Sequence, residues 1–246
     1  MLLQHLGANK LKFSTLKRTV IGGSACPPAM IKAFQDDYGV GVFHAWGMTE
    51  MSPLGTVGSL KAKQGRSLYG IDMKIVDENG GELPRDGQTS GELRVRGPWV
   101  IAAYFKGEGG DPLVDGWFPT GDVATIDADG FMQITDRGKD MIKSGGEWIS
   151  SIALEHIALS HPAVHEAAVV AVPHPKWGER PLLVAVRRPG TAPTRTDVLG
   201  HYEGRVARWQ VPDDVVFLPE LPHTATGKVL KLKLREMFRD HRLPEA

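Results

Sequence analysis

Apolar residues in the first fifty positions form two β-branched runs separated by a stretch with helical spacing. The run RTVIG at 18–22 predicts a strand, and AMIKAFQDDYG at 29–39 predicts a helix that follows two prolines and ends at Gly39. A second strand is predicted at 40–46, VGVFHAW. This alternation indicates an α/β layer with a parallel sheet whose strand ends carry loops.

The pattern changes between Gly70 and Asp136, where short apolar runs are separated by turns rich in Gly and Asp. Such spacing is typical of antiparallel β structure. Within it, Asp127 and Asp129 have the spacing of a calcium-binding loop, but Phe131 stands where that loop needs an oxygen ligand. The sequence therefore predicts a hairpin turn there.

After Gly145 helical spacing returns in ISSIALEHIALS, where Ser150 or Ser151 can cap the start and Pro162 prevents continuation. The elements predicted next are strands at 164–172 and 181–186, a helix at 197–209, a strand at 214–218 and a last helix at 229–239. These form a compact α+β unit. We expect the chain to divide near Lys139, in a polar and glycine-rich segment, into domains 1–138 and 139–246.

Composition places the chain among ordinary globular proteins. Of its 246 residues 41% are hydrophobic and 24% charged, and 29 basic side chains balance 29 acidic ones. This balance disfavours disorder and removes the positive field that draws proteins to nucleic acid or anionic membranes. No apolar stretch approaches the roughly 20 residues of a membrane span, and the first residues contain no signal-peptide core. A single cysteine, Cys26, fits a reducing compartment, so we expect a cytoplasmic protein.

Residues suited to binding phosphate or sugar follow the strands predicted in the first half. Gly22 and Gly23 let a planar ligand or a phosphate approach the backbone, although a plain strand-to-helix turn has the same pattern. Thr49 places a hydroxyl beside the carboxylate of Glu50; this pair suits a phosphoryl oxygen and Mg²⁺ but also occurs as an ordinary helix cap. Asp122, in GWFPTGD, suits the vicinal hydroxyls of a ribose.

Basic residues gather at two places in the second half. Arg137, Lys139 and Lys143 lie close to two glycines in DRGKDMIKSGGE, and Lys228 stands in PHTATGK before the last helix. Six segments, taken together and in this order, resemble the motifs of one known family: GGSACPP, HAWGMTE, GELRVRG, GWFPTGD, DRGKDMIKSGGE and PHTATGK.

The ordered set resembles the adenylate-forming superfamily of acyl-CoA synthetases, luciferases and peptide-synthetase adenylation domains, from about Thr19 to Arg235. WGMTEMSP and KSGGEWISS are similar to bacterial medium- and long-chain fatty-acyl-CoA ligases, a branch that includes methylmercaptopropionate-CoA ligases. The resemblance implies the C-terminal portion of a large AMP-binding domain, with an α/β layer and an antiparallel β region, followed by a small mobile α+β domain.

The resemblance also implies roles at matched positions. Thr49 matches a phosphate contact, Glu50 a Mg²⁺ ligand and Asp122 the acceptor for the ribose hydroxyls. Lys228 matches the lysine that stabilises negative charge during adenylation. The other matched positions are the adenine loop Gly22, Gly23, Ser24 and Ala25, the opposite adenine wall His44, Ala45, Trp46, Gly47 and Met48, the ribose or phosphate contact Arg137, the hinge Lys139, the ligand contact Lys143, and the pantetheine-tunnel segment Gly145, Gly146, Glu147 and Trp148.

The implied reaction is ATP-dependent formation of acyl-CoA. A fatty-acid carboxylate attacks ATP, with Mg²⁺ bound, to give acyl-AMP and pyrophosphate, and the CoA thiolate then displaces AMP. The alternatives are a noncatalytic nucleotide-binding fragment and an adenylation domain that serves a carrier protein, which the KSGGEW segment disfavours. The implied partners are the fatty acid, ATP and CoA, without nucleic acid, and a homodimer is compatible with the full-length enzyme.

Some features depart from the family pattern. Pro119, His223 and Lys231 stand where many relatives carry Arg, Lys and Arg. The family's phosphate-binding loop and most of its acyl pocket lie upstream of the matched region, so we expect a fragment with weak or no ligase activity alone. Lys231, Lys233 and Arg235 of the last helix either meet CoA phosphates or form a solvated surface.

Overall fold

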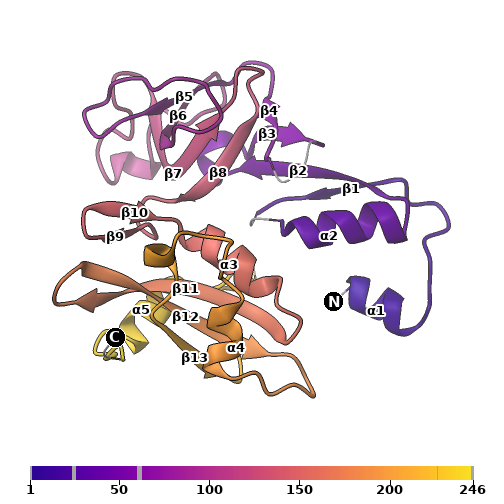
Figure 1. Cartoon of the computed structure of the whole chain (residues 1–246). Coiled ribbons are helices and arrows are strands. Elements are labelled where there is room, and N and C mark those ends of the chain that lie inside the picture. The colour runs from indigo at the N-terminus through magenta and orange to yellow at the C-terminus, as the bar shows by residue number, and fades with distance from the viewer. Residues whose placement is uncertain (1, 24–25, 60–62, 226, 245–246) are drawn as a thin grey trace. The chain divides into compact units, whose positions relative to one another are not determined.

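The computed structural model describes residues 2–23, 26–59, 63–225 and 227–244. The chain divides into two compact units, Met1–Thr135 (unit 1) and Asp136–Ala246 (unit 2), whose elements are labelled in Figure 1. Within the described ranges no helix has both the length and the apolar character needed to cross a bilayer.

Unit 1 begins with a mixed four-stranded sheet in the order β1-β2-β3-β4. The predicted parallel arrangement holds only for β1 and β2, because the other two pairs are antiparallel. The chain reverses directly after β2, where the Met48 N–H donates to the Pro53 carbonyl at 2.8 Å. The elements are α1 (Leu2–Ala8), β1 (Arg18–Ile21), α2 (Pro28–Lys32), a π-helical turn (Ala33–Asp37), β2 (Gly41–Gly47), the 3-10 turn η2 (Thr49–Met51), β3 (Leu54–Gly58) and β4 (Arg66–Ser67).

The second sheet of unit 1 has the order β5-β6-β7-β8, and its β5–β6 and β6–β7 pairs are antiparallel, as predicted. Alternate side chains of β6, such as Leu93 and Val95, point into its core. Trp46 of β2 and Met51 of η2 belong to the same buried cluster. The strands are β5 (Asp72–Val76), β6 (Gly91–Arg96), β7 (Phe118–Ile126) and β8 (Met132–Arg137), with a 3-10 turn η3 (Phe105–Gly107) before β7.

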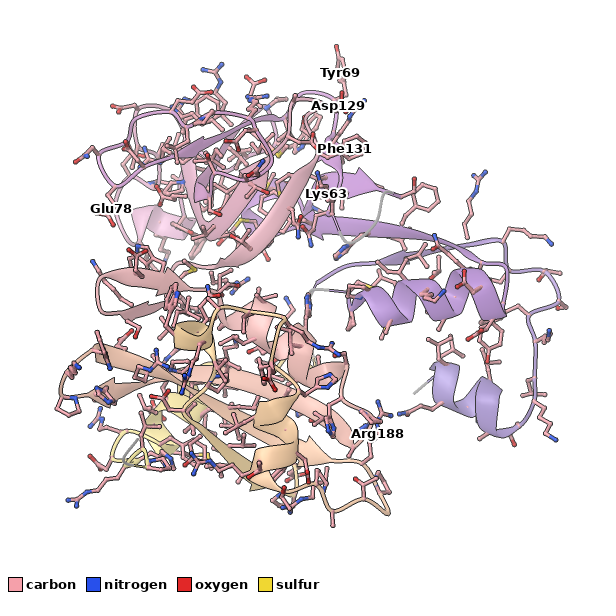
Figure 2. The ribbon with its side chains drawn as sticks, viewed as in Figure 1. Lys63, Tyr69, Glu78, Asp129, Phe131 and Arg188 are labelled. Carbon is pink, nitrogen blue, oxygen red and sulfur yellow. The ribbon has the colours of Figure 1, made fainter. Side chains whose placement is uncertain are left out.

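A tight hairpin joins β7 to β8, where the sequence predicted a turn. The Asp127 carboxylate accepts hydrogen bonds from the backbone N–H groups of Asp129 and Phe131, at 3.1 and 2.8 Å. Figure 2 labels both residues on this turn. The carboxylate is also paired with Lys63, which lowers the pKa of Asp127. No cluster of three or more metal-ligating side chains occurs among the residues that the structure describes.

Unit 2 is built on a sheet in which β12 pairs with β11, β13 and, at one end, β9. Strands β9 and β10 form a short hairpin that hydrophobic periodicity did not predict, because each has only three residues. The elements are β9 (Ile142–Ser144), β10 (Glu147–Ile149), α3 (Ser151–Leu159), β11 (Val164–His174), β12 (Gly178–Arg187), α4 (Arg195–Gly200), a 3-10 turn η4 (Arg208–Gln210), β13 (Asp214–Leu218) and α5 (Lys231–Met237).

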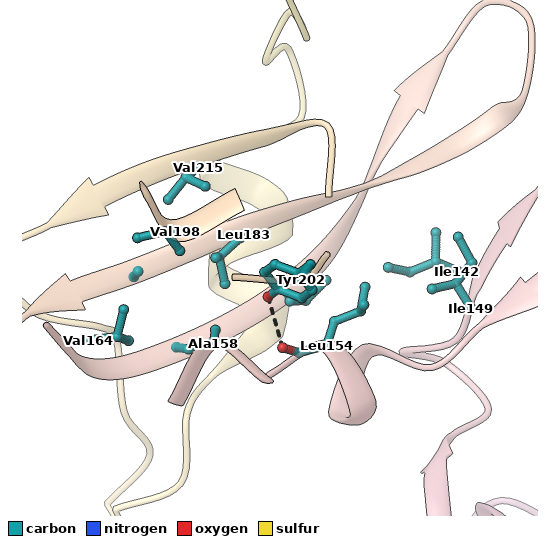
Figure 3. Close-up of a cluster of buried hydrophobic side chains, with 12 residues drawn as sticks. Ile142, Ile149, Leu154, Ala158, Val164, Leu183, Val198, Tyr202 and Val215 are labelled. Atoms are coloured by element: carbon teal, nitrogen blue, oxygen red, sulfur yellow. Dashed lines mark hydrogen bonds between the residues drawn. The ribbon is translucent and has the colours of Figure 1, made fainter. Parts of the chain in front are cut away.

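Helices cover both faces of this sheet, which explains the nearly continuous apolar runs of β11 and β12. On one face Val169 and Leu183 pack against Leu154 of α3, and the Tyr202 hydroxyl donates to the Leu154 carbonyl at 2.8 Å (Figure 3). On the other face Leu234 of α5 packs against a second buried cluster that contains Val170.

The predicted helix at 197–209 is wrong in its second half. Helix α4 ends at Gly200, and turns occupy 201–205. Gly204 has a φ of +71°, a left-handed conformation that an α-helix cannot contain. At α3 the structure distinguishes the two candidate caps, because the Ser150 side chain accepts the Ala153 N–H at 3.1 Å.

Candidate active site

The predicted adenine loop and adenine wall are neighbours in unit 1. Strand β1 pairs with β2 so that Ile21 faces His44, which is 2% exposed, and Gly22 then lies against Ala45. A Cβ atom at Gly22 would be 3.1 Å from the Ala45 carbonyl oxygen, so only glycine fits without a shift. Gly23 has a φ of +84°. The loop residues Ser24 and Ala25 lie outside the described residues.

Trp46 connects this wall to the predicted ribose-binding carboxylate. Its indole N–H donates a 2.8 Å hydrogen bond to Asp122, and both side chains are buried. Asp122 sits at an irregularity in the β6–β7 pairing, where Gly121 has a φ of +72°. The Thr120 hydroxyl spans this bulge, because it donates to the Leu93 carbonyl and accepts the Asp122 N–H. The backbone of the Thr-Gly-Asp sequence thus departs from regular strand geometry, and this departure sets the direction of the Asp122 carboxylate.

Thr49 and Glu50 lie on the η2 turn directly after β2, where Thr49 is exposed and Glu50 half-buried. The Tyr104 hydroxyl donates to Glu50 Oε1 at 3.2 Å, and the Ile101 N–H donates to the Glu50 carbonyl at 2.9 Å. Desolvation and the Glu50 carboxylate raise the pKa of Tyr104. Sequence reasoning missed Tyr104, since it belongs to none of the six segments.

Gly47 and Met48, the last two residues of the predicted wall, lead directly into this turn. A Cβ at Gly47 would lie 2.0 Å from the Pro53 carbonyl oxygen, so any side chain would force the reversal after β2 apart. The wall residues Ala45 and Trp46 and the turn residues Thr49 and Glu50 therefore occupy one continuous stretch whose path tolerates only glycine at position 47.

In unit 2 the predicted tunnel segment is the β9–β10 hairpin. Gly145 and Gly146 form its turn with φ values of +61° and +93°. The Lys143 ammonium lies 5.1 Å from the centre of the Trp148 ring across the two strands, a cation–π contact. Glu147 and Trp148 are exposed.

The Trp177 loop between β11 and β12 supports this hairpin. The Gly145 N–H donates to the Trp177 carbonyl at 2.8 Å, and a Cβ at Gly145 would approach the Trp177 ring to 2.9 Å. The Lys143 N–H donates to the Glu179 carboxylate at 3.0 Å. A pocket of about 1130 Å³ adjoins the hairpin, and its lining includes Trp177, Trp209, Arg180, Arg195 and Arg208.

The predicted hinge lies in a turn. The Arg137 carbonyl accepts the Asp140 and Met141 N–H groups at 2.9 and 3.0 Å. Lys139, between Arg137 and Asp140 in the chain, is exposed. The Arg137 N–H donates to the Asp136 carboxylate at 2.7 Å.

Lys228 is exposed on a tight loop before α5. The Thr224 hydroxyl accepts the Lys228 N–H at 3.1 Å, and the Thr224 N–H donates to the Lys228 carbonyl at 2.7 Å. The structure corrects the interpretation of α5 as a ligand-facing or solvated basic surface for two of its three cations: Lys231 pairs with Glu155, and Arg235 pairs with Asp140, each at 2.6 Å, whereas Lys233 is exposed.

Comparison with known proteins identifies the class. Residues 1–105 match the AMP-binding enzyme family, and residues 153–228 match the AMP-binding enzyme C-terminal domain. The chain therefore belongs to the AMP-binding enzymes, as the six segments predicted.

Named relatives place it beside acyl-CoA ligases. It is 54% identical to 3-methylmercaptopropionyl-CoA ligase of Ruegeria lacuscaerulensis, covering 97% of this chain and 47% of that protein. It is 52% identical to medium-chain-fatty-acid–CoA ligase of Ectopseudomonas oleovorans, covering 97% and 46%. The chain thus spans about half the length of the curated relatives it matches.

Solved structures agree in fold. ATP-bound MatB from Rhodopseudomonas palustris superimposes with a TM-score of 0.84 at 31% identity, covering 90% of this chain and 45% of that one. The o-succinylbenzoate CoA synthetase of Bacillus subtilis, in complex with its acyl-adenylate intermediate, gives 0.84 at 28% identity, covering 99% and 50%.

Proposed function

We propose that the chain carries the ribose-binding and lysine-bearing part of an ATP-dependent fatty-acyl-CoA ligase. A fatty-acid carboxylate attacks the α-phosphorus of ATP and releases pyrophosphate, and the CoA thiolate then attacks the acyl carbon and releases AMP. The observation that carries the proposal is the Trp46–Asp122 hydrogen bond, which joins the wall beside Gly22 to a buried carboxylate.

In this proposal unit 1 binds the nucleotide. Asp122 accepts hydrogen bonds from the ribose hydroxyls, and Trp46 fixes the orientation of its carboxylate. Thr49 donates to a phosphate oxygen. One carboxylate beside a hydroxyl is a donor set that fits Mg²⁺, which keeps several waters and shares phosphate oxygens with a nucleotide. Glu50 would hold the ion, which when bound neutralises phosphate charge.

Unit 2 supplies charge and the thiol site. The exposed Lys228 ammonium stabilises the negative charge that develops when the carboxylate attacks phosphorus. The β9–β10 hairpin guides the CoA thiol. In the adjacent pocket Arg180 and Arg195 are paired with Asp213 and Asp214, and the exposed Arg208 suits a phosphate of CoA. The hinge at Lys139, a cytoplasmic location and a homodimer of the complete enzyme remain parts of this proposal.

Two assays on the purified chain test the proposal. Calorimetry with AMP and with ATP plus Mg²⁺ measures nucleotide binding, and synthetic acyl-AMP plus CoA measures release of acyl-CoA and AMP. We expect AMP binding that Asp122→Asn weakens and that Asp115→Asn, in an exposed turn, leaves unchanged. Because the complete reaction is expected to be weak or absent in this chain alone, the assay with supplied acyl-AMP decides: AMP binding without release of acyl-CoA from acyl-AMP would favour the noncatalytic nucleotide-binding function, and transfer to a carrier protein but not to CoA would favour the adenylation-domain function.

A further inference from the structure

Lys231 begins α5, three residues after Lys228, and its ammonium is held in a nearly buried network. Its Nζ atom lies 2.6 Å from Glu155 Oε1 and 2.7 Å from the hydroxyl of Ser151. The Lys231 and Glu155 side chains are only 14% and 15% exposed. Two charges withdrawn from water in this way need good geometry and further hydrogen bonds to be tolerated.

Those further bonds connect several elements. The Ser151 hydroxyl donates to Asp136 Oδ1 at 3.0 Å, and the Ser151 N–H donates to the other oxygen of the same carboxylate. Glu155 Oε1 also accepts the Val169 N–H of β11 at 2.8 Å. The network therefore joins the start of α5 to the start of α3, to β11 and to the end of β8.

The network lies at the edge strand β11 and joins elements that pack on opposite faces of the sheet. Leu154 of α3 packs in the buried cluster on one face, whereas Leu234 of α5 packs in the cluster on the opposite face. Lys231 therefore links two helices that otherwise touch different sides of β11 and β12. The other ion pair of α5, Arg235–Asp140, lies one turn further along the helix, so Lys231 supplies the charged contact at the first residue of α5.

A lysine close to a serine also occurs in hydrolytic Ser–Lys pairs, but the geometry here excludes that chemistry. Ser151 is fully buried, and its hydroxyl donates to Asp136. The ammonium of Lys231 is paired with Glu155, so it is not a free base. The network is therefore a support and not a reaction centre.

What it supports is the Lys228 loop. The Leu230 N–H donates to the Pro222 carbonyl at 2.7 Å, and His223 bridges to Val229, so these contacts hold the two ends of the Lys228 loop together. Its first end is fixed by Leu221, which is 2% exposed, and its second end runs directly into Lys231. We infer that Lys231 is a positioning residue that holds the Lys228 loop in place, a role that rests on the function proposed above for Lys228.

Hydrogen exchange on the purified chain tests this inference without requiring ligase activity. We expect Lys231→Met to speed exchange of the amides in peptide 222–230 by about tenfold, because local opening of the loop no longer has to break the network. Lys231→Arg, which retains the charge and the donors, should stay within about threefold of wild type. Lys233→Met removes an exposed cation from the same helix and should change exchange less than about twofold.

A second variant covers the case in which the unpaired Glu155 carboxylate prevents folding. Glu155→Gln combined with Lys231→Met removes the unpaired Glu155 charge, while Asp136 keeps its hydrogen bonds from Ser151 and from the Arg137 N–H, and the double variant should again loosen peptide 222–230. Unchanged exchange in this loop, an equal effect of Lys233→Met, or a uniform increase that includes β11 and β12 would each overturn the inference. Failure of AMP binding would count against the proposed function alone, since the exchange readout does not depend on it.

Discussion

The Trp46 indole N–H and the Asp122 carboxylate, 76 residues apart, meet at 2.8 Å in the interior of unit 1. A buried carboxylate needs such partners, and a donor from a rigid ring also fixes which way its oxygens point. This contact links β2, which forms the predicted adenine wall, to the bulge in β7.

Trp46→Phe should weaken nucleotide binding. The substitution keeps an aromatic ring but removes a hydrogen bond to a charged group, a bond that contributes about 1.5–3 kcal/mol. We expect AMP affinity, measured by calorimetry, to fall about tenfold. Trp117→Phe, at a half-buried ring of the same unit that contacts Lys74 and Arg96, is the matched control. Equal AMP affinity for wild type and Trp46→Phe would show that the indole does not orient Asp122.

Gly47→Ala should destabilise unit 1, because the new methyl group would lie 2.0 Å from the Pro53 carbonyl oxygen. Overpacking of this kind costs about 1–3 kcal/mol. Gly200→Ala is the control, since no atom lies within 4 Å of its added Cβ and it ends a helix. Urea unfolding should show a lower midpoint for the first variant and an equal or higher one for the second.

Glu50→Gln should remove most of the effect of Mg²⁺ on ATP binding. A neutral amide is a poorer ligand for this ion than a carboxylate. We expect Mg²⁺ to raise the ATP affinity of wild type about tenfold more than that of the variant, and chelation by EDTA to abolish the difference. Glu78→Gln changes an exposed turn carboxylate (Figure 2) and should behave as wild type. A full Mg²⁺ response in Glu50→Gln would assign the ion to other ligands.

Lys228→Ala should separate the two half-reactions. Loss of one charge-stabilising donor typically lowers a rate about a hundredfold or more. In any preparation with measurable pyrophosphate exchange, we expect exchange to fall by that factor while thioester formation from supplied acyl-AMP stays within about twofold. Lys233→Ala should alter neither rate. An equal loss of both half-reactions in Lys228→Ala would contradict the assignment.

Glu155→Gln should change how stability depends on pH. Burial raises the pKa of Glu155, and that of Asp136, even though Lys231 opposes the shift. The folded state therefore binds protons more tightly than the unfolded chain. The stability contributed by these carboxyls is present below their unfolded pKa values and is lost as the pH rises through the folded ones.

The measurement is the free energy of unfolding in urea from about pH 4.5 to about pH 8. Wild type should lose more stability over this rise than Glu155→Gln, so the difference between them should shrink or reverse in favour of the variant. Glu203→Gln, at an exposed turn, should run parallel to wild type. Parallel curves for all three proteins would show that Glu155 does not titrate with folding.

Sequence patterns predicted the parts of the fold that have long apolar periods. Strand β11 and helix α3 were found because buried residues repeat along them, and the Asp127 turn because its side chain bonds the local backbone. The β9–β10 hairpin was missed, since three-residue strands leave no period to detect.

The candidate site, too, contains residues that the sequence predicted and residues that it missed. Residues within contiguous segments, such as Thr49 and Glu50, could be picked out from local sequence. Tyr104 could not, because its contact with Glu50 spans 54 residues. The charge network was missed for a related reason: Lys231 and Arg235 have the spacing of a solvated helix face, and only the tertiary fold brings Glu155 and Asp140 to them.

The bonds between Asp136 and Ser151 close a ring of backbone that contains the turn at Lys139 and the β9–β10 hairpin. A backbone rotation confined to Lys139 would have to break both hydrogen bonds between Asp136 and Ser151. A backbone rotation before Asp136 would leave both bonds and the ring intact. The carboxylate of Asp136 is therefore a natural place for an isotopic label that tests whether the proposed hinge rotates at Lys139 or before Asp136.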